Sequence, residues 1–293
     1  MPDLPTASVI VPTNERPVHL RACLEALAAL DYGGREYEVV VVADSGSEDV
    51  ESVVGEFRHR LPLQLLRQPN AGPGAARNAG AARAGGELLA FTDDDCRPRP
   101  DWLRRLAEQT VARPGEGVGG RTVNAVADNV YSEAAQLVID VGYAQNNSGA
   151  ASRRWFATNN LAVPADGFRA VGGFDPAYRT AEDRDFCARW TASGRTMSYE
   201  PRAVVEHARS LSLEAFARLH FRYGRGAFRF HRSQRRCWNR QPLIEPGYYA
   251  ALAREPFRRN LGLRAVALEA LLLVWHASNT AGFAWEALRA RRR

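Results

Sequence analysis

The chain contains the stretch Glu87-Leu-Leu-Ala-Phe-Thr-Asp-Asp-Asp95, a short apolar run that ends in three consecutive carboxylates. A continuous apolar run of this length is typical of a strand that is buried on both faces of a sheet. Three adjacent carboxylates repel one another and need a counter-charge. Hard divalent cations accept such oxygen ligands, so Asp93 and Asp95 are candidates for a ribose contact and a metal ligand. The alternative is a solvated acidic turn or a helix N-cap.

Similar apolar runs lie upstream of this stretch, and each is followed by a segment with helical spacing. The order strand–helix therefore repeats, which predicts an α/β fold with a mainly parallel sheet and helices on both faces. In such sheets ligands bind at the carboxyl ends of the strands, where this chain has its polar clusters. We expect strands at residues 8–12, 38–43, 63–67 and 87–92, and helices at 20–30, 50–60 and 75–84.

The remainder of the chain is less regular. We expect helices at 101–113 and within 128–150, and a further helix opened by Ala181. Strands are expected at 117–126, 158–163, 196–199 and 203–205, and the rest is helical in character. No linker rich in Ser or Pro divides the chain. The expected organisation is a catalytic domain at 1–208 and a basic helical extension at 209–293.

Two upstream features allow a nucleotide contact. Asp44 follows a strand and could accept hydrogen bonds from a base or ribose, or it could cap the next helix. The stretch Asn70-Ala-Gly-Pro-Gly-Ala-Ala-Arg-Asn78 joins a glycine-rich loop to a helix. Its backbone N–H groups and Arg77 could face a phosphate, or the loop could be a turn before a packing helix.

Two downstream features allow catalysis. Glu182 and Asp183 precede a helix, where carboxylates stabilise the helix dipole, but a carboxylate there could also act as a general base. His207 ends a predicted strand and could be a metal ligand or a hydrogen-bonded structural residue.

Taken in order, these motifs resemble family 2 glycosyltransferases of the GT-A fold over residues 6–210. The stretches that carry the resemblance are Ser8-Val-Ile-Val-Pro-Thr13, Val42-Ala-Asp-Ser-Gly-Ser47, Asn70 to Asn78, Phe91-Thr-Asp-Asp-Asp95, Asn159-Asn160, Val171-Gly-Gly-Phe-Asp175, Glu182-Asp183 and His207. The resemblance implies a GT-A-like nucleotide-binding sheet. It also implies an inverting transferase that uses a nucleotide-diphospho sugar with Mg²⁺ or Mn²⁺.

The resemblance also implies roles for individual residues. Asp183 matches the catalytic base, Asp95 matches the metal ligand, and His207 matches a metal or diphosphate ligand of some members. The implied donor nucleotide site comprises Thr13, Glu15, Asp44, Arg77, Asp93 and Asp94. The implied donor sugar and acceptor site comprises Asn159, Asn160, Asp175 and Glu182.

Two departures from the family pattern refine this prediction. Many members have Tyr after the Thr that matches Thr13, whereas this chain has Asn14, so an aromatic side chain that could stack on the base is missing. Processive members carry Q-x-x-R-W and membrane helices, whereas Gln234-Arg-Arg-Cys-Trp238 has Cys in place of the Arg. A polysaccharide synthase is therefore not expected.

Charge is unevenly distributed along the chain. Residues 208–293 hold 17 basic and 5 acidic side chains, whereas residues 1–100 hold 10 basic and 15 acidic ones. Five arginines at helical spacing form one stripe, which is a solvated face or a site for an anion such as a lipid-linked diphosphate, the donor diphosphate or an anionic membrane surface. No nucleic-acid-binding fold surrounds them, so a nucleic-acid partner is not expected. The arginines are Arg218, Arg222, Arg225, Arg229 and Arg232.

Composition supports an ordinary globular protein, with 45% hydrophobic and 25% charged residues. The four cysteines lie far apart without metal-binding spacing, which favours a reducing, cytoplasmic setting. A peripheral position at the inner face of a membrane is the alternative that the arginine stripe allows.

The expected function is that of a non-processive glycosyltransferase of the hexosyltransferase type. Its donor is expected to be a nucleotide sugar, a UDP-sugar before others, and its acceptor a sugar, a lipid-linked molecule or a small molecule. A nucleotidyltransferase also uses carboxylates on an α/β sheet, but it releases pyrophosphate and does not need Asp183. The third interpretation is a non-catalytic module that binds a sugar nucleotide or a lipid.

Overall fold

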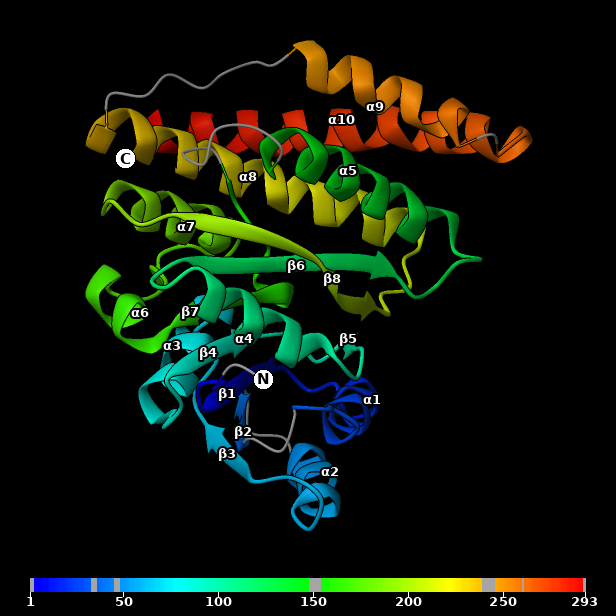
Figure 1. Cartoon of the computed structure of the whole chain (residues 1–293). Helices are drawn as coiled ribbons and strands as arrows, with labels where there is room; N and C mark the ends of the chain where they lie inside the picture. The colour runs from blue at the N-terminus through cyan, green and yellow to red at the C-terminus, as the bar shows by residue number, and fades with distance from the viewer. Residues whose placement is uncertain are drawn as a thin grey trace. The chain divides into compact units, whose positions relative to one another are not determined.

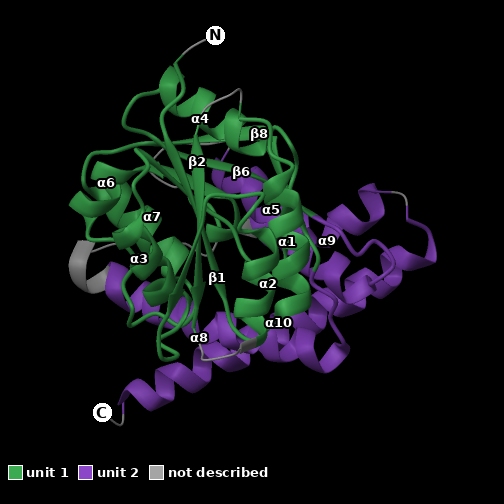
Figure 2. Ribbon diagram, turned by 90° about the horizontal axis from the view of Figure 1, so that it is seen from below, with its two compact units in different colours: residues 1–123, 149–208 green, residues 124–148, 209–293 purple. Residues whose placement is uncertain are grey.

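The computed structural model describes residues 3–32, 36–44, 48–147, 154–238, 246–259 and 261–291. Contacts within the chain divide it into two compact units (Figure 2). Unit 1 comprises residues 1–123 and 149–208, and unit 2 comprises residues 124–148 and 209–293. The division expected from the sequence, at residue 208, assigned 124–148 to the catalytic domain, whereas the contacts group that segment with the C-terminal helices.

The described residues of unit 1 form a sheet of eight strands in the order β3-β2-β1-β4-β7-β6-β8-β5 (Figure 1). Their bounds are β1 (Ala7–Thr13), β2 (Tyr37–Ala43), β3 (Leu63–Arg67), β4 (Leu88–Phe91), β5 (Cys96–Pro98), β6 (Gly117–Asn124), β7 (Leu161–Pro164) and β8 (Met197–His207). The strands β3, β2, β1 and β4 run parallel to one another. This half of the sheet confirms the predicted α/β class.

The other half of the sheet makes it mixed. The strand β7 pairs antiparallel with β4 and β6, and β5 pairs antiparallel with β8. The two short strands expected at 196–199 and 203–205 are one strand, β8, although Pro201 lies between them. Proline cannot donate a ladder hydrogen bond, but β5 pairs only with residues 205–207, so Pro201 lies where that side of β8 has no β5 partner. The three-residue strand β5 was not expected.

Helices cover both faces of the sheet. Residues alternate along each parallel strand, so Val9, Val39 and Val41 join the core on one face, while Val40 and Val42 pack with Ala76 on the other. The helices of unit 1 are α1 (Pro17–Ala28), α2 (Glu48–Phe57), α3 (Pro73–Arg83), α4 (Trp102–Ala112), α6 (Ala165–Val171) and α7 (Glu182–Ala192), with a 3₁₀ turn, η2 (Thr158–Asn160).

The helix α3 lies directly on the sheet because its residues are small. A Cβ atom at Gly80 would come within 2.6 Å of Ile10 Cγ2 on β1 and 3.1 Å of Val42 Cγ2 on β2. This close approach explains the alanine-rich composition of α3. It also fixes Arg77, three residues earlier on the same helix, above the carboxyl edge of the sheet.

Unit 2 is helical. It contains α5 (Val130–Asn147), α8 (Leu213–Trp238), α9 (Pro246–Arg258) and α10 (Leu263–Arg291). Its core joins Leu137 of α5 and Phe216 of α8 to Leu252 of α9 and Leu268 of α10. Within the described part of the chain, no helix is both long enough and apolar enough to span a bilayer.

Candidate active site

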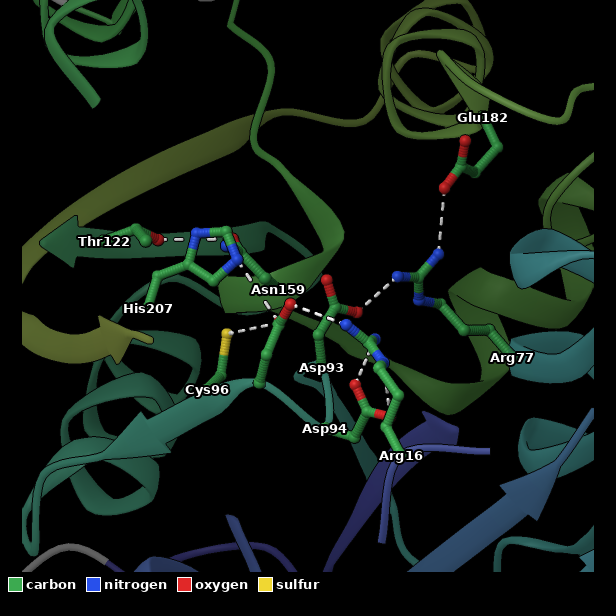
Figure 3. Close-up of polar contacts among 10 residues, drawn as sticks. Arg16, Arg77, Asp93, Asp94, Cys96, Thr122, Asn159, Glu182 and His207 are labelled. Carbon is green, nitrogen blue, oxygen red and sulfur yellow. Dashed lines mark hydrogen bonds and ion pairs between the residues drawn. The ribbon is translucent and has the colours of Figure 1, made fainter. Parts of the chain in front are cut away.

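The candidate site lies at the carboxyl edge of the parallel strands. Thr13 ends β1, Asp44 follows β2, and the turn that starts at Asp93 follows β4. Because β1 pairs in parallel with β2 and β4, the carboxyl ends of these three strands meet at one edge of the sheet. Figure 3 shows the side chains that gather there.

Asp94 is the buried centre of the acidic turn. Thr13 Oγ1 donates a hydrogen bond to Asp94 Oδ2 at 2.7 Å. Arg16 Nε donates to the same oxygen at 3.1 Å, and Arg16 Nη2 pairs with Oδ1. Burial raises the pKa of Asp94 to about 6, although the Arg16 charge opposes this shift. Both oxygens of Asp94 face protein groups, which favours a role in holding the turn over the expected nucleotide contact.

Asp95 faces two different partners. Its Oδ2 accepts a hydrogen bond from Arg16 Nη1 at 2.9 Å, and its Oδ1 lies 3.2 Å from His207 Nε2. The antiparallel pairing of β5 with β8 places Cys96 opposite His207, which brings this imidazole to the acidic turn. His207 Nε2 is buried and makes no hydrogen bond with the described residues.

The group formed by Asp95, Cys96 and His207 has the geometry of a metal site, since one ligand atom from each lies within 4.8 Å of the others. Burial raises the pKa of the Cys96 thiol well above its usual value, so Cys96 stays neutral and is a poor ligand for a hard cation. The remaining donors are a carboxylate oxygen of Asp95 and Nε2 of His207, and this nitrogen makes no hydrogen bond with the described residues. This donor pair fits Mn²⁺, and more weakly Mg²⁺.

Arg77 joins the acidic turn to the helix α7. Its Nη2 donates to Asp93 Oδ1 at 2.5 Å and its Nη1 donates to Glu182 Oε1 at 2.9 Å (Figure 3). Arg77 and Glu182 are buried, whereas the side chain of Asp93 is 22% exposed. Glu182 was expected at the donor sugar and Arg77 at the nucleotide. Both roles stay predictions, because in this structure the two side chains are hydrogen-bonded to each other.

Asp183 lies in the first turn of α7, two residues after Ala181, whose φ of 69° is left-handed. The Asp183 carboxylate accepts a hydrogen bond from the Arg184 backbone N–H at 2.7 Å. Burial raises the pKa of Asp183, and the charges of Arg184 and Arg77 oppose this shift. A carboxylate whose pKa is raised accepts a proton more readily, as a general base requires.

Asp44 shapes the glycine-rich loop. It accepts hydrogen bonds from Gln68 Nε2 at 2.7 Å, from the Ala71 N–H at 2.9 Å and from the Gly72 N–H at 2.9 Å. These partners hold the loop that enters α3 and therefore position Arg77. Residues 45–47 lie outside the described residues.

The two consecutive asparagines have different surroundings. Asn160 is fully buried; it accepts from Trp102 Nε1 at 2.8 Å and donates to the carbonyls of Arg121 and Ala203, both at 3.0 Å. This side chain is hydrogen-bonded inside the protein, and the contact expected between Asn160 and the donor sugar or acceptor stays a prediction. Asn159, also buried, accepts from Thr122 Oγ1 at 3.2 Å.

Two further expected residues are exposed. Asp175 accepts a hydrogen bond from the Ala177 N–H at 2.9 Å and is otherwise open to solvent. Glu15 is exposed and adopts a left-handed φ of 53°. The roles expected for Asp175 at the sugar and for Glu15 at the nucleotide stay predictions.

Arg16 was not expected in the site. Three adjacent carboxylates need a counter-charge, and Arg16 lies three residues after Thr13, the last residue of the neighbouring strand β1. That signal was present, but the left-handed turn at Glu15 that directs Arg16 toward the carboxylates was not evident from residue types.

Two solved glycosyltransferases share this architecture. The mannosyltransferase PcManGT from Pyrobaculum calidifontis, in complex with GDP-Man and Mn²⁺, aligns with a TM-score of 0.67 at 20% identity over 99% of this chain and 85% of its own. TarS 1–349 of S. aureus, in complex with UDP-GlcNAc, aligns with a TM-score of 0.55 at 18% identity over 98% of this chain and 92% of its own. The fold is therefore of the GT-A glycosyltransferase class, as the sequence predicted.

Sequence relatives identify the family. The profile of glycosyl transferase family 2 matches residues 8–175. Glycosyltransferase AglE of Haloferax volcanii is 29% identical over 227 residues, which are 76% of this chain and 73% of AglE. The pre-mycofactocin glycosyltransferase of Mycobacterium tuberculosis is 31% identical over 68% of this chain, which spans 42% of that relative. The chain belongs to glycosyl transferase family 2 and is a glycosyltransferase.

Proposed function

We propose that this glycosyltransferase is inverting and metal-dependent, and that it transfers a sugar from a nucleotide-diphospho sugar to an acceptor hydroxyl. The observation that carries the proposal is the Arg77 bridge. One buried guanidinium contacts Asp93 of the acidic turn and Glu182, the neighbour of Asp183. The candidate metal turn and the candidate base are therefore held within the reach of one side chain.

Asp95 Oδ1 and His207 Nε2 are the groups that would hold Mg²⁺ or Mn²⁺. The bound ion would offset negative charge on the diphosphate leaving group. The fit rests on the 3.2 Å spacing of these atoms and on the buried imidazole nitrogen that lacks a hydrogen bond. The presence of Mn²⁺ with PcManGT is consistent with this assignment.

Asp183 would act as the general base. The acceptor oxygen attacks the anomeric carbon while its proton passes to the Asp183 carboxylate. The bond between the anomeric carbon and the phosphate oxygen breaks, and the nucleoside diphosphate leaves with that electron pair. Attack opposite the leaving group inverts the anomeric configuration, so the product anomer reports the mechanism.

The donor is proposed to be a UDP-sugar. TarS was solved with UDP and with UDP-GlcNAc, which supports this choice, whereas PcManGT was solved with GDP-Man. Thr13, Asp44 and Asp93, at the ends of β1, β2 and β4, are the proposed supports of the nucleotide. A thermal-shift comparison of UDP- and GDP-sugars with Mn²⁺ tests this choice, because a ligand of the folded state raises its stability.

Asp183→Asn tests the catalytic assignment. This change keeps the size of the side chain and removes the base, so kcat should fall by about 10²–10⁴-fold while the donor still binds with Mn²⁺. Asp185→Asn is the matched control, since Asp185 lies in the same helical turn and pairs with Arg189. Near-normal sugar transfer by Asp183→Asn would exclude Asp183 as the base, and release of pyrophosphate from a nucleoside triphosphate supplied with the acceptor would favour the nucleotidyltransferase interpretation.

Removal of the metal distinguishes the interpretation as a metal-dependent enzyme from the interpretation as a binding module. EDTA should stop transfer and Mn²⁺ should restore it, whereas a pure binding module consumes no donor under either condition. Transfer at full rate in EDTA would exclude the proposed metal dependence.

The acceptor is proposed to be a sugar, a lipid-linked molecule or a small molecule, and an anionic membrane surface is a proposed partner. Arg225 and Arg229 pair with Glu286 within unit 2, so they are poor probes of that surface. The triple variant Arg218→Gln, Arg222→Gln, Arg232→Gln changes the exposed members of the stripe. Sedimentation with vesicles that contain anionic lipid should decrease for this variant; unchanged binding would exclude the stripe as the membrane contact.

A further inference from the structure

Arg16 distributes its donors over two neighbouring carboxylates. Its Nε and Nη2 contact Asp94, and its Nη1 donates to Asp95 Oδ2 at 2.9 Å. A planar guanidinium can serve both carboxylates at once because its donors are fixed in a fork. The left-handed backbone at Glu15, the preceding residue, directs the chain into this arrangement.

The two oxygens of Asp95 consequently have different surroundings. Oδ2 is directed at Arg16, whereas Oδ1 is directed at His207 Nε2 and lies 3.9 Å from Cys96 Sγ. Asp95 is itself buried, so its carboxylate has little room to rotate. Only Oδ1 therefore lies beside the imidazole nitrogen that completes the candidate metal site.

The number of carboxylate oxygens offered to a cation affects which cation binds. Ca²⁺ takes six to eight oxygen ligands and often binds a carboxylate through both oxygens, whereas Mg²⁺ requires a near-octahedral set. A partner that occupies one oxygen of a ligating carboxylate therefore works against Ca²⁺.

We propose that Arg16 is a positioning residue that restricts Asp95 to one oxygen toward the metal, so that the site selects Mg²⁺ and Mn²⁺ over Ca²⁺. This inference rests on the proposed metal dependence. It assigns Arg16 a role that is separate from simple charge compensation of Asp94.

The ratio of the Ca²⁺ affinity to the Mn²⁺ affinity distinguishes this positioning role from a simple charge effect. Removal of the Arg16 charge should strengthen the binding of any divalent cation, but the effect cancels in the ratio of Ca²⁺ to Mn²⁺ because both ions carry the same charge. A role limited to holding the turn should likewise weaken both ions alike. A change in coordination by Asp95 should alter the ratio.

The experiment uses Arg16→Ala and Arg16→Lys in the full chain. Mn²⁺ binding is followed by the EPR signal of the free ion, and Ca²⁺ is then added to displace it. The single ammonium of Lys should pair with fully buried Asp94 and release Asp95 Oδ2, so Arg16→Lys keeps the charge but not the restriction. Arg21→Ala is the matched control: Arg21 lies on α1, is 43% exposed against 40% for Arg16, and pairs with Glu56.

Both Arg16 variants should shift the affinity ratio toward Ca²⁺ by about tenfold, since the loss of a group that orients a metal ligand typically changes affinity by 10–100-fold. Arg21→Ala should leave the ratio unchanged. Circular dichroism checks folding, and Arg16→Lys supplies the answer if Arg16→Ala is unfolded. An unchanged ratio in Arg16→Lys, with normal Mn²⁺ binding by the wild type, overturns the role of Arg16 alone. A wild-type protein that binds no Mn²⁺ overturns the metal site and this inference together.

Discussion

The two units use arginine–carboxylate networks with opposite charge balance. At the strand ends of unit 1, Arg16 and Arg77 serve four carboxylates, those of Asp93, Asp94, Asp95 and Glu182. In unit 2, Arg225 and Arg229 share the single carboxylate of Glu286.

This difference in charge balance agrees with the proposal that the network of unit 1 binds a divalent cation. The first network retains an excess of two negative charges when all its groups are ionised, which a divalent cation would balance. The second network already has more cations than carboxylates, and its arginines belong to α8 while its glutamate belongs to α10. The second network joins two helices, so the same pair of residue types serves packing in unit 2 and, under the proposed function, chemistry in unit 1.

Among the substitutions that test this difference between the two networks, Arg77→Met is expected to have the largest effect on stability. The change leaves Asp93 and Glu182 without their shared cation in a buried setting. We expect a loss of about 3–5 kcal/mol in the free energy of unfolding, measured by urea denaturation. Arg21→Met, which breaks an exposed pair, is the control. A loss below 1 kcal/mol for Arg77→Met would show that the network is more open to water than its burial indicates.

A buried histidine in unit 2 gives the next largest effect. His220 packs against Phe216 and Trp275, and neither of its ring nitrogens has a hydrogen-bond partner among the described residues. Burial lowers its pKa to about 4, and the charge of Arg209 adds to this shift.

This shift predicts acid sensitivity. Between pH 6.5 and 4 the unfolded chain binds a proton that folded His220 does not, so stability falls as the pH falls through this range, by about 2 kcal/mol at pH 5 relative to pH 8. His220→Phe should reduce the difference between urea midpoints measured at these two pH values. An identical difference in wild type and variant would exclude His220 as its source.

The arginine pair of unit 2 gives a smaller effect. Glu286→Gln removes the carboxylate that Arg225 and Arg229 share, but their side chains are 32% and 39% exposed, so water screens the charges. We expect a loss of about 1 kcal/mol, seen as a lower thermal midpoint that moves closer to wild type in high salt. A loss as large as that of Arg77→Met would remove the contrast between the two networks.

The smallest effect concerns backbone strain. Among the described residues, the non-glycine positions with positive φ are Glu15 and Ala181, and each directly precedes residues of the candidate site. Ala181→Gly relieves the left-handed strain but adds chain entropy to the unfolded state, so the net gain in stability should be about 0.5 kcal/mol. A lower stability of Ala181→Gly, measured by calorimetry, would show that the Ala181 side chain contributes packing that outweighs the strain.

The sequence predicted the parallel half of the sheet better than the antiparallel half. Strands β1, β2 and β4 are buried on both faces and form continuous apolar runs, which are distinctive. Strand β5 has three residues, and Pro201 interrupts the pattern of β8. Their pairing depends on contacts between residues more than 100 positions apart, such as Cys96 with His207.

Prediction of the candidate site had similar limits. Asp95 follows strand β4 and Arg77 lies on helix α3 after the glycine-rich loop, so their positions in the chain predicted that they would lie near the sheet edge. The surroundings of Asn160 could not be predicted, because a polar residue beside another asparagine does not reveal its buried partners Trp102 and Ala203. Arg16 was missed because its role depends on the backbone conformation of Glu15.

The grouping of α5 with the C-terminal helices has a consequence for biosynthesis. Helix α5 ends at Asn147 and α10 begins at Leu263. At 5–20 residues per second, the ribosome needs about 6–23 s to make the intervening segment. During this interval Ala134, Leu137 and Val141 of α5 lack the apolar partners that α9 and α10 later supply. A gene shortened to residue 208 would make this state permanent, so shortened chains should be prone to aggregate unless residues 124–148 are replaced as well.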